Sequence, residues 1–201
     1  MIHLVDDDEA VTNSCCFLLE SLGYPVQCWN QSERFLREAP LGETGIALLD
    51  MRMPGMDGHC LFQAMREQSS TLAVIFLTGH GDIPMAVEEI QSGAVDFLQK
   101  PVALNALQEA ISKGYEHSLR LVKMHQLKQR YRQLTAKERE VARYVASGRM
   151  NKDIAAQMNI ALRTVEVHRS RVMEKMEAKT MAELIMQMNT IHLSTHGLPG
   201  R

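Results

Sequence analysis

The sequence predicts an α/β domain, with five parallel strands in a doubly wound sheet, followed by a smaller all-α domain of four helices. Three observations lead to this fold class. Apolar strands alternate five times with helical patterns up to residue 117, only helical patterns follow, and 201 residues allow two domains that each bury a core. The expected segments are residues 1–117, a helical linker at 118–133, the helical domain at 134–190 and a disordered tail at 191–201.

The elements of the α/β domain follow from the spacing of apolar residues. Each strand is a short apolar run, and each helix has apolar residues at steps of three and four. Gly23 ends the first helix, Ser32 begins the second, and the uninterrupted apolar run at 72–77 is typical of a strand covered on both faces. The expected strands are residues 2–5, 26–29, 46–49, 72–77 and 95–98, and the expected helices are 8–22, 32–37, 58–67, 84–92 and one from about 105.

Polar side chains follow four of these strands. Asp6 and Asp7 come after the first strand, Asp50 after the third, Thr78 after the fourth and Lys100 after the fifth. The carboxyl ends of parallel strands meet at one edge of a sheet, where three carboxylates would repel one another unless a hard cation such as Mg²⁺ lay among them. We therefore expect a metal and phosphate site, although each residue alone is more often a helix cap, a loop hydroxyl or a surface cation.

Residues 115–134 join the two parts without a Pro-rich or Gly-rich tether. Met124, Leu127, Tyr131 and Leu134 recur at alternating steps of three and four, which predicts an amphipathic helix. Signal transmission or pairing with a second copy is one role for it. Fewer than three heptads are sustained, so a helix lying on its own domain is the favoured alternative.

The C-terminal part has the pattern of a compact helical domain. Residues 135–138 and 180–183 are capping boxes that begin the first and last of its four helices. The two helices between them flank a tight turn at 159–161, as in a helix-turn-helix. The helix at 162–176 combines an apolar stripe with a charged face, so we expect core contacts on one side and a partner on the other.

The two parts of the chain differ in the sign of their net charge. Residues 1–117 contain 6 Lys and Arg against 17 Asp and Glu, whereas residues 118–201 contain 16 against 7. The basic part favours a nucleic-acid surface, although a solvated basic face explains the charge alone equally well. No apolar run reaches the roughly 20 residues that cross a bilayer and no export signal is present, so we expect a cytoplasmic protein with no membrane partner.

The cysteines show no metal-ligand spacing. Cys15, Cys16, Cys28 and Cys60 form no paired motif, and the eight histidines are scattered. We interpret the thiols as small buried hydrophobes in a reducing compartment, and we expect no metal-thiolate chemistry.

On the residues at its strand ends, the segment 1–117 resembles the receiver domains of two-component response regulators. The resemblance implies the strand order 2-1-3-4-5 and makes Asp50 the acceptor of a phosphoryl group from a sensor histidine kinase. It also implies that Mg²⁺ is bound by Asp6, Asp7 and Asp50 together with the backbone carbonyl of Arg52.

The same resemblance implies how phosphorylation is sensed. Thr78 and Lys100 are implied to contact the phosphoryl group, and Lys100–Pro101 matches the family's cis-peptide position. Phe97 falls at the position of a switch aromatic, although a core phenylalanine explains it about as well. In this family the surface around 84–92 then forms a homodimer.

Three runs, at residues 134–140, 151–155 and 163–168, resemble the LuxR-type DNA-binding domain, and the likeness spans 134–190. It implies double-stranded operator DNA as a partner and RNA polymerase as a further one. The basic face is then a DNA-binding surface and not merely a solvated one. The implied contacts are base edges for Glu166, Val167 and Ser170, and phosphates or nearby edges for Lys152, Arg163, Thr164, Arg169 and Arg171.

Position 166 departs from members of this family, which often have Lys there. The Glu166 carboxylate can accept a hydrogen bond from cytosine N4 but repels phosphate. We therefore expect this chain to prefer other bases than the members with Lys at that position. The basic residues near Glu166 would supply the affinity for DNA.

The interpretation of the whole chain is a response regulator of the branch that includes nitrogen-fixation and nitrate regulators, without enzymatic turnover of other substrates. One rival is an aspartyl-phosphate phosphotransferase similar to haloacid-dehalogenase-like phosphatases. Those carry a second Asp two residues after the nucleophile, where this chain has Arg52. A second rival is a DNA-binding regulator with a phosphate-independent scaffold, which the intact set of acidic residues, Thr78 and Lys100 disfavours.

Overall fold

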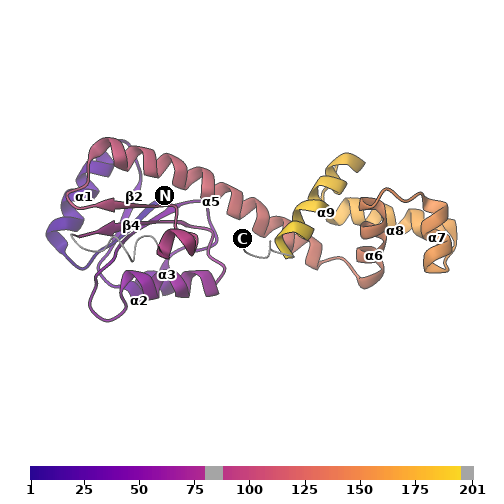
Figure 1. Cartoon of the computed structure of the whole chain (residues 1–201), viewed down its shortest axis with the longest axis horizontal. Helices are drawn as coiled ribbons and strands as arrows, with labels where there is room; N and C mark the ends of the chain where they lie inside the picture. The colour runs from indigo at the N-terminus through magenta and orange to yellow at the C-terminus, as the bar shows by residue number, and fades with distance from the viewer. Residues whose placement is uncertain (80–87, 196–201) are drawn as a thin grey trace. The chain divides into compact units, whose positions relative to one another are not determined.

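The structure is a computed structural model that describes residues 1–79 and 88–195, with side chains described up to residue 192 in the last helix. The chain divides into two compact units, Met1–Val122 and Lys123–Arg201. Both are drawn in Figure 1, and each is described by itself.

The first unit is a parallel α/β sheet. Its strands are β1 (Ile2–Val5), β2 (Val26–Trp29), β3 (Ile46–Asp50), β4 (Ala73–Thr78) and β5 (Asp96–Gln99). They lie in the order β2-β1-β3-β4-β5, and every neighbouring pair is parallel. The fold class and the strand order expected from the sequence are therefore confirmed.

Helices cover both faces of this sheet. α1 (Glu9–Ser21) and α5 (Leu104–Arg132) pack on one face, and α2 (Ser32–Glu38) and α3 (Gly58–Glu67) pack on the other (Figure 1). In β3, Ile46 and Leu48 join one apolar cluster while Ala47 and Leu49 join the other. A strand buried on both faces needs an uninterrupted apolar run, which is the pattern that the sequence shows.

The fourth expected helix, at 84–92, is described only in part. Residues 88–91 are helical, whereas 84–87 lie outside the described residues. After β5, α5 begins at Leu104 and is anchored to the sheet by Ser118, whose hydroxyl accepts from the Gly45 N–H at 3.0 Å and donates to the Thr71 carbonyl at 2.6 Å.

The second unit is a four-helix domain. Its helices are α6 (Ala136–Ala146), α7 (Asn151–Met158), α8 (Leu162–Lys175) and α9 (Met181–Thr195). The capping box at its start is present, with the Thr135 N–H donating to the Glu138 carboxylate at 2.8 Å and the Glu138 N–H donating to the Thr135 hydroxyl at 3.3 Å. Asn159 turns the chain between α7 and α8 in the left-handed conformation, at φ 51°.

The helix expected at 118–133 is present as the continuation of α5, and Leu127 and Tyr131 near its end pack against the core of the helical unit. The expected disordered tail at 191–201 is wrong for 191–195, because α9 continues to Thr195 and Ile191 is buried in that core. Residues 196–201 lie outside the described part.

The interpretation of the cysteines as four buried thiols is also wrong. Cys16 and Cys28 form a disulfide, and Cys28 and Cys60 are exposed. The two bonded residues are 12 positions apart and come together because α1 packs on β2. In the described ranges, no helix combines the length and apolar character needed to span a bilayer.

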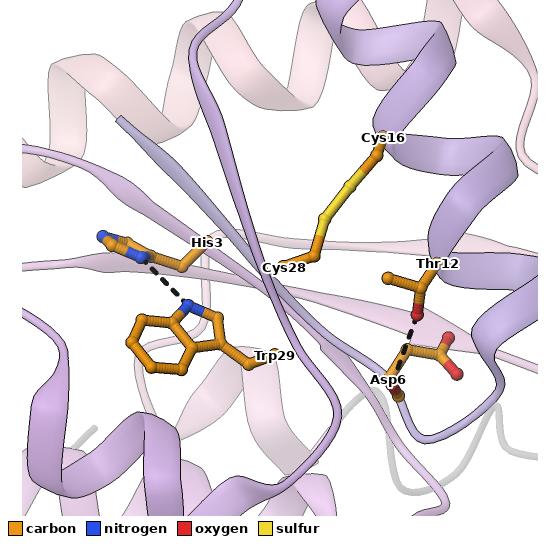
Figure 2. Close-up of a disulfide and its surroundings, with 6 residues drawn as sticks. All are labelled: His3, Asp6, Thr12, Cys16, Cys28 and Trp29. Atoms are coloured by element: carbon orange, nitrogen blue, oxygen red, sulfur yellow. Dashed lines mark hydrogen bonds between the residues drawn. A yellow bond between two sulfur atoms is a disulfide. The ribbon is translucent and has the colours of Figure 1, made fainter.

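A buried histidine gives the α/β unit a predictable response to acid. His3 on β1 is 1% exposed and lies beside Phe35 and Trp29, whose indole N–H donates to His3 Nδ1 at 3.3 Å (Figure 2). Burial lowers the pKa of His3 to about 4. Between that value and the ordinary pKa of His, the unfolded chain binds more protons than the folded one, so stability falls as the pH falls.

We expect the free energy of unfolding to drop by about 2 kcal/mol more from pH 7 to pH 5 in the wild type than in His3→Gln. Glutamine can still accept the Trp29 bond but does not titrate. Urea unfolding followed by the fluorescence of Trp29, the single tryptophan, measures both proteins. An identical pH dependence in the two would contradict the assignment to His3.

Candidate functional site

Three carboxylates gather at the carboxyl edge of the sheet. One oxygen each from Asp6, Asp7 and Asp50 lies within 4.8 Å of the others. Asp6 and Asp50 are buried at 1% and 8% exposure, while Asp7 is exposed. The strand register produces this grouping, because Val5 at the end of β1 lies opposite Leu49, the residue before Asp50.

Lys100 supplies the positive charge of the cluster. Its ammonium donates to Asp6 Oδ2 at 2.7 Å and to Asp50 Oδ1 at 2.5 Å. Burial opposes the charged form of Lys100, but the bonds to Asp50 and Asp6 outweigh it and raise its pKa. Burial raises the pKa of Asp50, against the effect of Lys100. The site therefore holds a cation and two buried carboxylates in direct contact.

Backbone groups fix the two buried carboxylates. The Asp8 N–H donates to Asp6 Oδ1 at 3.0 Å, and the Arg52 N–H donates to Asp50 Oδ2 at 3.1 Å. Arg52 lies in the loop after β3, as predicted. The Lys100–Pro101 peptide bond is cis. Three carboxylate oxygens at this spacing are the type of donor set that a hard divalent cation such as Mg²⁺ takes.

Thr78 and Phe97 lie on β4 and β5, the two strands that follow β3 in the sheet. Thr78 is buried at the end of β4, and its hydroxyl donates to the Leu98 carbonyl of β5 at 3.5 Å. Phe97 is half-buried on β5 and packs against the sheet core. In this structure the Thr78 hydroxyl therefore bonds to the backbone of the neighbouring strand.

Gly58 is a site residue that the sequence analysis missed. It begins α3 after Asp57 caps that helix, and its N–H donates to the Met51 carbonyl at 3.2 Å. A Cβ at Gly58 would overlap the carbonyl oxygen of Asp50 and approach the Met51 Cα at 3.2 Å. α3 can lie this close to Asp50, the candidate phosphoacceptor, only because residue 58 has no side chain.

We expect Gly58→Ala to lower the free energy of unfolding by about 3 kcal/mol, since backbone atoms on both sides must shift. Gly42→Ala is the matched control, because a Cβ at Gly42 meets nothing within 4 Å. Urea unfolding followed by Trp29 fluorescence compares them. If both variants unfold like the wild type, the close approach at Gly58 does not constrain the site.

The predicted DNA-contacting residues lie on α7 and α8. Val165 and Val172 of α8 are buried in the helical core, so the other side of the helix is left to solvent. Arg163 pairs with Glu166 across one turn, Nη1 to Oε2, at 3.3 Å. Of the predicted DNA contacts, those with exposed side chains are Lys152, Arg163, Thr164, Glu166, Val167, Ser170 and Arg171.

Arg169 differs from its neighbours. It is half-buried, and its guanidinium donates to Asn151 Oδ1 of α7 and contacts Met181 Sδ of α9 at 3.5 Å. These contacts tie the charged helix to the two helices beside it. Its side chain is thus already bonded within the domain, which the charge pattern did not indicate.

Comparison with known proteins agrees with this architecture. Residues 2–112 match the response regulator receiver domain, and residues 132–188 match the luxR family of bacterial regulatory proteins. The fold and the acidic site define a response regulator, and the chain belongs to the response regulator family, with a LuxR-type DNA-binding domain after its receiver domain.

Individual relatives share this arrangement over nearly the whole chain. The tetrathionate response regulatory protein TtrR of Salmonella typhimurium is 59% identical over 184 residues, which are 92% of this chain and 89% of that protein. The transcriptional regulatory protein FixJ of Rhizobium meliloti is 39% identical over 188 residues, 92% of each chain. Among solved structures, the response regulator StyR is similar with a TM-score of 0.69 and 35% identity, over 94% of this chain and 97% of that one.

Proposed function

We propose that this response regulator accepts a phosphoryl group on Asp50 from a sensor histidine kinase and then binds operator DNA as a homodimer. The observation that carries the proposal is the contact of Lys100 with both Asp6 and Asp50 at the sheet edge. A nucleophilic carboxylate held beside a lysine and two further acids is suited to phosphoryl transfer.

In the proposed reaction an oxygen of Asp50 attacks the phosphorus of a phosphohistidine. The new P–O bond forms as the P–N bond breaks, and the histidine leaves with the electron pair. Asp6, Asp7, Asp50 and the Arg52 carbonyl would hold Mg²⁺, which when bound offsets the charge on the transferring oxygens. Lys100 exchanges its bond to Asp50 Oδ1 for a phosphoryl oxygen.

The proposed response to phosphorylation uses Thr78 on β4 and Phe97 on β5. The Thr78 hydroxyl turns from the Leu98 carbonyl toward the phosphoryl group, and Phe97 fills the space that it leaves. These changes bias the surface around 84–92 toward the homodimer, and residues 84–87 of that surface lie outside the described part of the chain.

A labelling experiment tests the phosphoacceptor. The full chain is incubated with labelled acetyl phosphate, with Mg²⁺ or with a chelator, and the product is mapped by peptide mass spectrometry. We expect an acid-labile phosphoryl group on the peptide that contains Asp50, formed only with Mg²⁺. Label at another residue, or labelling unaffected by the chelator, would exclude this site.

For DNA, we propose that α8 enters the major groove. Glu166, Val167 and Ser170 would face base edges, and Lys152, Arg163, Thr164, Arg169 and Arg171 would hold phosphates or nearby edges. The exposure of all these residues except Arg169 supports the assignment. RNA polymerase is a further proposed partner, and the cytoplasm the proposed location.

We expect Glu166→Lys to raise the affinity for random duplex DNA at low salt and to steepen the salt dependence by about one phosphate contact. The substitution removes the ion pair with Arg163. It also replaces a carboxylate, which the DNA phosphates repel, with an ammonium group, which they attract. Fluorescence anisotropy over a salt series measures the slope. Glu174→Lys, also exposed on α8, makes the same charge change nearer the end of the helix. Equal salt slopes in the two variants would argue that residue 166 lies no closer to the DNA phosphates than residue 174.

We further propose that the regulated pathway responds to tetrathionate. The support is the 59% identity, over 92% of this chain, to the tetrathionate response regulatory protein of Salmonella typhimurium. Transcript profiling of an Asp50→Glu strain, with and without tetrathionate, tests the assignment. A transcript set unrelated to sulfur-compound respiration would overturn it.

A further inference from the structure

The Cys16–Cys28 disulfide lies where a dissolved reagent can reach it. Cys16 is on α1 and is half-buried, while Cys28 is exposed on β2, an edge strand of the sheet. Figure 2 shows the bond joining helix and strand. A chain that binds DNA works where thiols are kept reduced, and disulfides in such proteins are usually transient and redox-sensing.

The helix that carries Cys16 is thinly packed. Of the α1 side chains, Leu19 is buried, and Cys15, Cys16 and Leu18 are only partly buried against the sheet. By comparison α3 buries Gly58, Leu61, Phe62 and Met65. A covalent link to β2 therefore adds a constraint that the apolar contacts of α1 do not already supply.

The start of α1 leads directly into the acidic site. Asp8 caps the helix by accepting from the Ala10 and Val11 N–H groups, and the Thr12 hydroxyl donates to the Asp6 carbonyl at 3.3 Å (Figure 2). Cys16 lies four residues after Thr12, about one turn further along the same helix. Fixing α1 at Cys16 thus restrains the segment that positions Asp6.

We propose that Cys16 and Cys28 are a reversible dithiol modification site whose oxidant is a polythionate, and that the bond holds α1 on β2. Naming tetrathionate as the oxidant rests on the proposed function. The more exposed Cys28 thiolate attacks a central sulfur of tetrathionate and expels one thiosulfate, leaving Cys28 joined to the second half. The Cys16 thiolate then attacks the Cys28 sulfur and expels the second thiosulfate.

The reaction balances. Two thiols give up two protons and two electrons, and one tetrathionate accepts the electrons and becomes two thiosulfate ions. Reduction by a dithiol restores the pair. Cys15, the neighbouring free thiol, is a poorer competitor, since burial and the Asp6 carboxylate raise its pKa and so disfavour its thiolate.

Peptide mapping of the full chain tests the site. The protein is reduced, freed of reductant, exposed to tetrathionate, to oxidised glutathione or to buffer, and digested without reduction. We expect tetrathionate to produce a Cys16–Cys28 crosslinked peptide and two thiosulfate ions per bond, in the wild type and in the matched controls Cys15→Ser and Cys60→Ser. Cys16→Ser should stop at the thiosulfate adduct on Cys28.

The other outcomes overturn the proposal. A bond from Cys15 or Cys60, adducts without a crosslink, or a crosslink with glutathione but not with tetrathionate each contradicts it. Amide hydrogen exchange of α1 tests the constraint, with exchange expected to slow by about tenfold in the oxidised chain and to stay unchanged in Cys16→Ser. Equal exchange with and without the bond refutes the holding role. Labelling of Asp50 is measured separately in the reduced chain, where no crosslink acts on Asp6, so its absence there beside a crosslink formed in the oxidised sample would count against the proposed function alone.

Discussion

Asp50→Asn is expected to abolish phosphorylation of the chain by acetyl phosphate and Mg²⁺. The amide is a far weaker nucleophile than the carboxylate, and Asp6, the other buried acid of the cluster, keeps its bonds to Lys100 and to the Asp8 N–H. Asparagine retains the acceptor for the Arg52 N–H, so the loop after β3 should keep its course.

Asp57→Asn is the matched control for this variant. Asp57 lies in the same loop and accepts from the Cys60 N–H at 2.8 Å as the cap of α3, a role that asparagine also performs. We expect labelling of Asp57→Asn at the wild-type rate. Acid-labile label persisting in Asp50→Asn would mean that another residue is the acceptor.

Lys100→Met is expected to slow the phosphorylation of Asp50 by about 100-fold, the usual loss when one preorganised donor to a developing charge is removed. Methionine keeps much of the length of the side chain but leaves Asp6 and Asp50 without their shared cation. The same loss of a competing charge should raise the affinity for Mg²⁺, so the slower reaction cannot be assigned to a missing metal.

Single-turnover labelling at saturating Mg²⁺ measures the rate. Lys113→Met serves as control, because Lys113 is an exposed lysine of the same unit that pairs with Glu109 and Asp96 instead of the acidic cluster. A labelling rate of Lys100→Met within about twofold of the control would show that Lys100 does not contribute to phosphoryl transfer.

The sequence was sufficient to predict the sheet and the meeting of polar side chains at its carboxyl edge. Uninterrupted apolar runs mark strands that are covered on both faces, and in a parallel sheet their carboxyl ends must meet, so the grouping of Asp6, Asp50 and Lys100 follows from the order of the elements. The capping box of Thr135 and Glu138 was equally local, since its partners are three residues apart.

Other features depend on packing between distant segments. The Cys16–Cys28 bond exists because α1 lies on β2, and the close approach of Gly58 depends on how α3 leaves the site. Glu89 is buried with its carboxylate against His59 of α3, although glutamate seldom occupies an interior. Arg169 likewise bonds Asn151 and Met181 across two helices. Sequence spacing carries no signal for such contacts.

The most direct test of the account is the affinity of the full chain for DNA with and without a phosphoryl group on Asp50. A duplex is first enriched from a random library by the chain treated with beryllofluoride and Mg²⁺, and the dissociation constant is then measured with and without that phosphoryl analogue. We predict tighter binding, as a dimer, only in the treated wild type and no response in Asp50→Asn. Equal affinity in all samples would contradict control of DNA binding through Asp50 and would favour a phosphate-independent scaffold.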